Sequence, residues 1–142
     1  MPRHTLEDYL STEDAMAYLE SNGTPVSEGT FIKHVHEYRH IVPIALGTRI
    51  HRQTGEASAM SVAFTKRMLD QYATGNWPVH HTDAEANGII DLVQLGEMTG
   101  YGKSSIKQRV FIRKQIGYKT IGRVTVVLRR DAEKMPKAKE RK

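Results

Sequence analysis

The chain has 142 residues, enough for one compact domain or two very small ones, and its 39% hydrophobic and 26% charged residues are ordinary for a globular protein. It contains no cysteine, which excludes disulfides, thiolate metal ligands and cysteine nucleophiles. No apolar run approaches the roughly 20 residues of a membrane helix, and the start of the chain lacks the apolar core of a signal peptide. We therefore expect a cytoplasmic, nucleoid-associated protein without a membrane partner or small-molecule ligand.

The net charge of +5 is unevenly distributed along the chain. Residues 1–80 contain 7 Lys and Arg against 9 Asp and Glu, whereas residues 81–142 contain 14 against 7. A basic half indicates nucleic acid as the partner, because Lys and Arg that neutralise phosphates release counterions. The alternative is a charge that only improves solubility.

Capping residues and hydrophobic periodicity predict an N-terminal unit over residues 1–73. Ser11 and Ser27 are predicted helix caps, because a hydroxyl before an apolar-periodic run accepts from the free N–H groups of the first turn. Alternating apolar residues predict a hairpin with a long polar tip. The predicted order is a helix over 12–20, a turn over 21–25, a helix from 27 to about 38–40, strands over 44–50 and 60–64 around the turn 52–56, and a helix over 65–72.

A linker is predicted over residues 74–88, from the turn signals Gly75-Asn76-Trp77-Pro78 and Asn87-Gly88. Trp77, the only tryptophan, is expected to pack the two halves together. A C-terminal basic unit is predicted over residues 89–136, followed by a basic tail over 137–142. Its predicted order is a helix over 89–98, a turn over 99–102, a helix over 103–114, a tight hairpin over 118–128 around Gly122-Arg123, and a helix over 129–135.

The second unit repeats the first in a shortened form. Residues 26–35 align with residues 101–110, and residues 46–49 align with residues 121–124. A repeated order of helix, turn, helix, hairpin and helix indicates a tandem array of one supersecondary unit.

Residues 92–135 resemble the winged helix-turn-helix unit of the excisionase and MerR-type DNA-binding families. The resemblance lies in the segment Gly-Lys-Ser-Ser-Ile-Lys-Gln-Arg of residues 102–109 and in the wing Tyr-Lys-Thr-Ile-Gly-Arg of residues 118–123. Residues 10–72 look like the same unit with a longer wing. The implied fold is mainly α with small β-hairpin wings, as two winged helix-turn-helix units in tandem. The chain departs from both families, since it lacks the long dimerising helix and effector domain of MerR-type regulators and has two units where excisionases usually have one.

The resemblance implies sequence-specific binding of double-stranded DNA, by a transcription regulator or a recombination directionality factor of a mobile element, and no enzymatic activity. In such a fold the second helix enters the major groove, and the wing lies along the backbone or the minor groove. The acids Glu28 and Glu37 on the first unit's second helix would repel phosphate, so that unit either contacts bases or serves dimerisation. The predicted DNA-binding residues are Ser27, Thr30, Lys33, His34, Arg49 and Arg52 in the first unit, and Lys103, Ser104, Ser105, Lys107, Gln108, Arg109, Arg113, Lys119 and Arg123 in the second.

Two other site motifs lack residues that their chemistry requires. Gly100–Ser105 resembles part of a phosphate-binding loop, but the required first glycine is Glu97 and the preceding segment reads as a helix. His34, His36 and His40 include an i, i+4 pair that suits zinc on a helix, but no cysteine supports it. Neither a metal nor another cofactor is predicted.

Three alternatives stay open at this stage. The chain can be a protein–protein interaction module, or an architectural module that bends DNA without base specificity. RNA binding is less expected, because RNA-binding proteins favour exposed aromatic residues, and aromatic residues of all kinds make up only 7% of the chain. Self-association on DNA is compatible with each DNA-binding reading.

Overall fold

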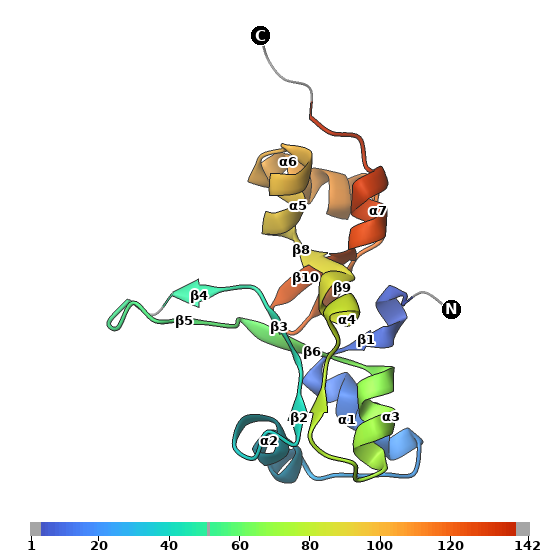
Figure 1. Ribbon diagram of the computed structural model, residues 1–142. Helices are drawn as coiled ribbons and strands as arrows, with labels where there is room; N and C mark the ends of the chain where they lie inside the picture. The colour runs from blue at the N-terminus through green and yellow to red at the C-terminus, as the bar shows by residue number, and fades with distance from the viewer. Residues whose placement is uncertain (1–3, 51, 139–142) are drawn as a thin grey trace.

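The computed structural model describes residues 4–50 and 52–138. In the view of Figure 1 the first half of the chain lies at the bottom, the second half lies at the top, and a thin two-stranded arm projects sideways between them. The first half contains the 3-10 helix η1 (Leu6–Asp8), β1 (Tyr9–Leu10), α1 (Thr12–Ser21), α2 (Glu28–His36), β2 (Ile41–Val42), β3 (Ile44–Leu46), β4 (Arg49–Ile50), β5 (Ala57–Ser58), β6 (Ser61–Thr65) and α3 (Lys66–Ala73). The second half contains β7 (Val79–His80), α4 (Asp83–Asn87), β8 (Ile89–Asp91), α5 (Leu92–Thr99), α6 (Lys103–Lys107), the π-helix η2 (Gln108–Ile112), β9 (Lys119–Ile121), β10 (Val124–Leu128) and α7 (Arg129–Lys134).

The predicted helix starts of the first half are confirmed by their caps. The hydroxyls of Ser11, Ser27 and Thr65 accept hydrogen bonds from backbone N–H groups in the first turns of α1, α2 and α3. Helix α2 ends at His36, before the predicted end at residues 38–40. Arg39 follows with φ of 56°, a left-handed conformation that cannot continue a right-handed helix.

The predicted fold class is wrong: the protein is a mixed α/β structure and not two mainly helical winged units. Each half contains a three-stranded antiparallel sheet, in the orders β1-β6-β3 and β8-β10-β9. The strands β1 and β8 precede the first helix of each half, and Ile89–Asp91 had been predicted as helix. Each expected hairpin is therefore paired with a further strand. These strands have only two or three residues, which is too short for an alternating pattern to predict them.

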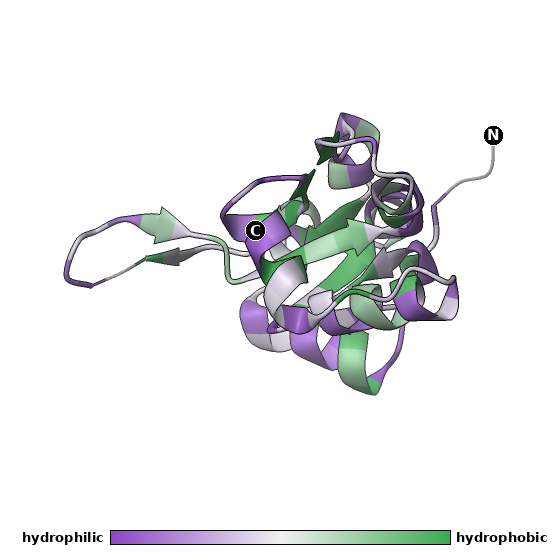
Figure 2. Ribbon diagram, turned by 90° about the horizontal axis from the view of Figure 1, so that it is seen from below, coloured by the Kyte–Doolittle hydropathy of each residue, from purple (hydrophilic) through white to green (hydrophobic). Residues whose placement is uncertain are grey.

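The arm is a separate feature of the first half. The predicted long hairpin divides into the sheet strands β3 and β6 and the two-stranded arm β4–β5, in which Arg49 pairs with Ser58 and Ile50 with Ala57. The arm reaches away from the body of the molecule, as Figure 2 shows from below. In the second half the two-residue turn Gly122-Arg123 stands in its place.

Apart from η1, β2, the arm strands β4 and β5, β7 and α4, both halves have the order strand, helix, helix, strand, strand, helix, and aligned residues occupy equivalent places. Each residue from Tyr9 to Glu20 has the same burial class as the residue at the corresponding position from Ile89 to Gly100. The pairs Leu46·Ser61 and Ile121·Val124 close the two hairpins at matching registers. The five residues missing from the α5–α6 turn and the missing arm account for the shorter second half.

Three hydrophobic clusters hold the fold together. One fills the first half under α1, α2 and α3, and one fills the second half under α5, α6 and α7. The third lies between the two sheets and takes residues from both, including Tyr9, Ile44, Ile121 and Val126. Figure 2 shows green strands crossing the centre of the molecule, among helices that mix purple, white and green. Since the sheets share a core, we expect the halves to unfold together.

The two halves meet through the same contact made twice. Gly47 packs on Val124, and a Cβ on Gly47 would lie 3.1 Å from Val124 Cγ2. The equivalent Gly122 packs on Ser61, the counterpart of Val124, and a Cβ there would lie 3.1 Å from Ser61 Cβ. Both glycines have positive φ, of 67° and 61°. A contact repeated in both directions is the signature of twofold symmetry, which here relates two halves of one chain.

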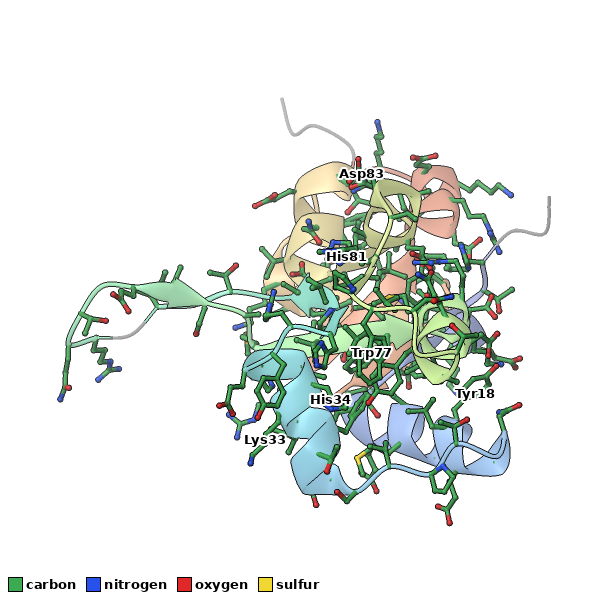
Figure 3. All side chains as sticks on the ribbon, turned by 60° about the horizontal axis from the view of Figure 1, so that its bottom comes forward. Tyr18, Lys33, His34, Trp77, His81 and Asp83 are labelled. Atoms are coloured by element: carbon green, nitrogen blue, oxygen red, sulfur yellow. The ribbon has the colours of Figure 1, made fainter. Side chains whose placement is uncertain are left out.

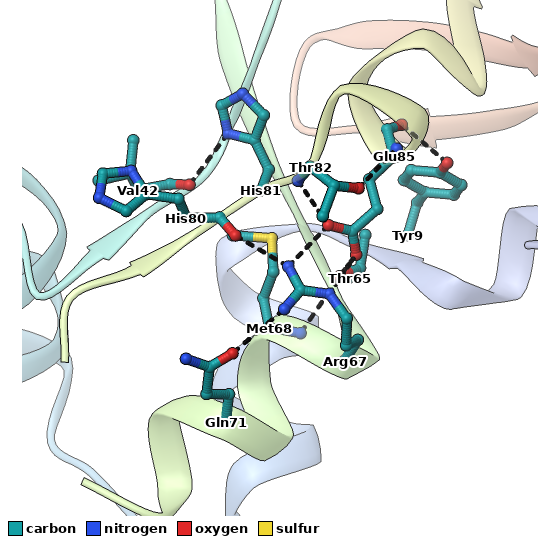
Figure 4. A network of polar contacts seen from close by, with 10 residues as sticks. All are labelled: Tyr9, Val42, Thr65, Arg67, Met68, Gln71, His80, His81, Thr82 and Glu85. Atoms are coloured by element: carbon teal, nitrogen blue, oxygen red, sulfur yellow. Dashed lines mark hydrogen bonds and ion pairs between the residues drawn. The ribbon is translucent and has the colours of Figure 1, made fainter. Parts of the chain in front are cut away.

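The segment predicted as a linker contains β7 and α4, and Glu85 anchors it to the first half. The buried Glu85 carboxylate accepts hydrogen bonds from Thr65 Oγ1 and from Arg67 Nη2, the latter at 2.7 Å, as Figure 4 shows. It also accepts from the backbone N–H of Thr82, and Tyr9 Oη donates to the Glu85 carbonyl. Burial alone would raise the pKa of Glu85, but the hydrogen bonds from Arg67, Thr65 and Thr82 lower it to about 2.

Candidate nucleic-acid interface

The cations of the second half gather in one stretch of chain. Residues 98–130 contain no Asp or Glu. A segment with a single sign of charge creates a positive potential over the surface that it covers. Its cations are Lys103, Lys107, Arg109, Arg113, Lys114, Lys119, Arg123, Arg129 and Arg130.

Helix α6 and its continuation η2 place part of this stretch on an exposed face. Gly100, with φ of 85°, ends α5 and lets the chain turn into α6. Ile106 and Val110 are buried and fix the helix on α5. The side chains of the other face are exposed: Lys103, Ser104, Lys107 and Gln108.

The predicted helix over 103–114 changes character and ends early. It widens into a π-helix over Gln108–Ile112, a form that is often found at functional sites. Lys114 then has φ of 49°, which stops it. Arg113 and Lys114 are both exposed beyond the helix end. Lys114 was not among the predicted site residues, because a regular helix to residue 114 gave no reason to expect an exposed turn there.

Four cations of this face are free of ion pairs. Within residues 4–50 and 52–138 the ion pairs are His4–Asp8 and Arg67–Glu85, so none involves a cation of the stretch 98–130. An exposed cation without a carboxylate partner is available to an external anion. The available residues on α6, η2 and the following turn are Lys103, Lys107, Arg113 and Lys114.

Arg109 is engaged within the protein. Its guanidinium lies over the Tyr101 ring, 3.8 Å from the centroid, and its Nη1 donates to Gln115 Oε1 at 3.1 Å. Its Nε donates to Ser105 Oγ at 3.4 Å. Arg109 and Ser105, both predicted to contact DNA, therefore brace the α5–α6 turn and the end of η2.

The two residues predicted on the second wing lie away from this face. Lys119 is half-buried and its Nζ donates to the Tyr9 carbonyl at 2.6 Å, so its charge ties β9 to the start of the chain. Arg123 is exposed, but its turn is held against Ser61 of the first half by the neighbouring Gly122. The turn is therefore part of the contact between the halves.

The predicted residues of α2 are divided between exposed and packed positions. Ser27 caps the helix and donates to Thr30 Oγ1, and Lys33 is exposed. His34 is half-buried, and its Nδ1 forms a hydrogen bond with Tyr72 Oη. Burial, and then the neighbouring His40, lower the pKa of His34 below its ordinary value.

The predicted residues of the first wing belong to the arm. Arg49 is in β4, and Arg52 follows at the exposed tip. His51 lies outside the described residues, as does the basic tail beyond residue 138. In the view of Figure 1, α2 lies at the lower end of the molecule and α6 at the upper end, and the arm projects to the left between them.

Searches for other kinds of site and for relatives give no assignment. Among the described residues, no three His, Cys, Asp or Glu side chains are grouped so that they could hold a metal ion. None of the helices in the described part of the chain has the length and apolar character to cross a membrane. No protein-family model, curated protein or solved structure matches the chain.

Proposed function

We propose that the protein binds double-stranded DNA through the exposed face of α6 and η2. The observation that carries this proposal is the cluster of unpaired cations Lys103, Lys107, Arg113 and Lys114 in a stretch of chain without acids. Duplex DNA presents closely spaced phosphates, and release of its condensed counterions makes such a surface bind.

The roles of the side chains follow from their chemistry. Lys103, Lys107 and Arg113 bind phosphates, which position the helix but do not identify the sequence. Gln108 is exposed on the same face and can pair with the edge of an adenine in the major groove, so it carries base specificity. Arg109 supports them by fixing the end of η2.

The first half supplies weaker contacts. The arm with Arg52 extends beyond the body and can follow a groove next to the α6 site. Helix α2 presents Lys33, but also the exposed acid Glu28, and the exposed Glu37 caps its C-terminal end. The pseudo-twofold relation thus presents two equivalent helices of unequal charge, with α6 as the principal contact.

A salt titration of duplex binding tests the proposal. Fluorescence anisotropy of a labelled duplex of about 20 base pairs is measured for the wild type and for Lys103→Ala/Lys107→Ala. We expect the double variant to bind more weakly and to reduce the slope of log K against log salt by about 2, because two phosphate contacts are lost.

The matched control is Lys66→Ala/Lys134→Ala, which removes the same charge from α3 and α7. It should keep the wild-type slope. Equal losses in the two double variants would mean that only net charge matters, and would contradict a site on α6. Selection of bound sequences from a random pool, repeated with Gln108→Ala, then tests base specificity.

Self-association is a second candidate function, favoured by Ile112. This side chain is 74% exposed beside the partly exposed Phe111, at the end of η2. An isoleucine this exposed contributes apolar area to a partner surface. Sedimentation velocity of the wild type and Ile112→Ser, with and without duplex, tests it: loss of a larger species in the variant supports it, and identical profiles contradict it.

A further inference from the structure

Four rings of the first half form a continuous stack, which we call the aromatic stack. Tyr38 stacks on His40 with ring centroids 5.6 Å apart, and His40 stacks on Trp77 at 4.5 Å. Trp77 in turn stacks on Tyr72 at 5.4 Å, with 21° between the planes. The sequence predicted that Trp77 packs the two halves together, and this is wrong, because its ring partners all belong to the first half.

Hydrogen bonds hold the aromatic stack in place. Trp77 Nε1 donates to the Tyr72 carbonyl at 2.9 Å, and Tyr72 Oη is bonded to His34 Nδ1. Figure 3 shows Trp77 and His34 side by side on the surface between α2 and the end of α3. Rings fixed in this way lose little conformational entropy when a ligand stacks on them.

The aromatic stack is open to solvent. The Tyr38 side chain is 54% exposed and the Trp77 side chain is 41% exposed. Both line a hollow of about 710 Å³, together with His40, Arg39 and His80. The hollow is large enough for a nucleotide, and its walls combine flat aromatic faces with cationic or protonatable groups.

The charges around the hollow select the ligand. The segments 33–42 and 71–82, which carry the aromatic stack, contain one acid, Glu37, against Lys33, Arg39 and five histidines. A quaternary ammonium ligand would bind the ring faces but would be repelled by Lys33 and Arg39. A purely apolar ligand would gain nothing from them. A flat ring that carries a negative charge can contact both the aromatic ring faces and the cations.

We propose that the aromatic stack binds an unpaired base of single-stranded DNA, with the base against the exposed rings and its phosphate at Arg39. Base stacking on aromatic side chains tolerates any sequence, because every base has a flat face. The site belongs to the first half and does not use α6. It therefore adds a single-strand activity to the proposed duplex binding and does not depend on it.

Fluorescence of Trp77 tests this proposal directly, because Trp77 is the only tryptophan. An oligothymidine of about eight nucleotides is titrated into the full-length protein, a length within the usual site size of single-strand binders. We expect saturable quenching. Tyr38→Ala, which keeps the reporter, should weaken binding by about tenfold, since one stacking contact is lost.

Two further variants sharpen the assignment. Arg39→Asn removes the cation but suits the φ of 56°, because asparagine tolerates the left-handed region, so it should weaken binding and flatten its salt dependence without harming the fold. Tyr118→Ala is the matched control, a tyrosine of the second half that packs edge-on against Phe111. It should leave the quenching unchanged.

The outcomes separate this site from the duplex site. Lys103→Ala/Lys107→Ala should bind oligothymidine like the wild type, whereas Tyr38→Ala should keep its duplex affinity. Absence of quenching by oligothymidine would overturn the proposal, as would equal quenching by a duplex of the same length. Tighter binding of oligouridine than of oligothymidine would overturn the assignment to DNA.

Discussion

The two halves of the protein share one frame but present different surfaces. Phe31 in α2 and Ile106 in α6 fill equivalent buried positions, and Val35 and Val110 form the next pair. On the exposed sides the halves differ: α2 begins at Glu28, is followed by Glu37 and adjoins the aromatic stack, whereas α6 and η2 carry cations without acids. The comparison shows that burial constrains which residues fill the inside of the two halves, whereas the exposed residues can differ in charge and in chemistry.

The closing helices differ in how they begin. Thr65 caps α3 and also donates to Glu85, whereas the equivalent Leu128 at the start of α7 offers no side-chain cap. The first half therefore depends on a buried carboxylate at this point, whereas the second half has Arg129, whose Nε donates to the Asn87 carbonyl at 2.7 Å. This difference predicts that the halves respond unequally to charge removal and to acid.

Removal of the Glu85 carboxylate should have the largest effect. Glu85→Ala leaves the buried Thr65 hydroxyl without its acceptor and removes the ion pair of Arg67, whose side chain is 39% exposed, so it should lower the free energy of unfolding by about 3 kcal/mol. Urea denaturation followed by Trp77 fluorescence measures it. The control Glu97→Ala removes an exposed carboxylate from α5 and should change stability by less than about 0.5 kcal/mol. Similar losses in both variants would disprove the role of the buried network.

Acid should reproduce part of this loss. Folding lowers the pKa of Glu85 from 4.5 to about 2, so its charged form stabilises the folded state fully above pH 4.5. The contribution, up to about 3 kcal/mol, should disappear as the pH falls from 4.5 towards 2. Denaturation curves across this range should be flatter for Glu85→Gln than for the wild type. Parallel curves would show that other groups govern acid unfolding.

Substitutions at the contact between the halves test the pseudo-twofold relation. Gly122→Ala and Gly47→Ala each combine a left-handed backbone with a crowded methyl group and should cost about 2 kcal/mol. Gly55→Ala is the matched control, with φ of 73° in open space, and should cost about 1 kcal/mol from the backbone alone. Ser61→Gly should recover part of the Gly122→Ala loss. Equal costs at all three glycines would mean that the halves are not tightly packed there.

Local signals predicted the helix starts of the first half, and long-range pairing explains the strands that they missed. The caps at Ser11, Ser27 and Thr65 act within one turn, so the sequence contains all the information that they need. The strands β1 and β8 exist only because β6 and β10 pair with them, and no periodicity arises from two or three residues. For the same reason, the sequence predicts each hairpin as an isolated wing, whereas in the structure each hairpin pairs with a third strand of a mixed α/β fold.

The candidate site was predicted only in part, because some of its residues contact parts of the chain that are distant in sequence. Lys103 and Lys107 were identified by helical spacing and charge, and the structure leaves both exposed. Lys119 donates a hydrogen bond to the carbonyl of Tyr9, which is far away in sequence, so the sequence did not predict this contact. The aromatic stack was also missed, because Tyr38 and Trp77 are brought together only by the fold. A cluster of aromatic and histidine residues near 34–40 and 72–81 was the available signal.

The smallest effect concerns the acids at the two ends of α2, Glu28 and Glu37, and it decides whether the first half faces DNA. If α2 and α6 contact one duplex, Glu28 and Glu37 repel phosphates, and Glu28→Gln/Glu37→Gln should raise duplex affinity severalfold, by less than about 1.4 kcal/mol. Anisotropy at low salt measures it, with Glu13→Gln/Glu20→Gln on α1 as the control of equal charge. An equal gain in both would reflect net charge alone. No gain in either would place α2 away from the duplex and leave the two halves with separate partners.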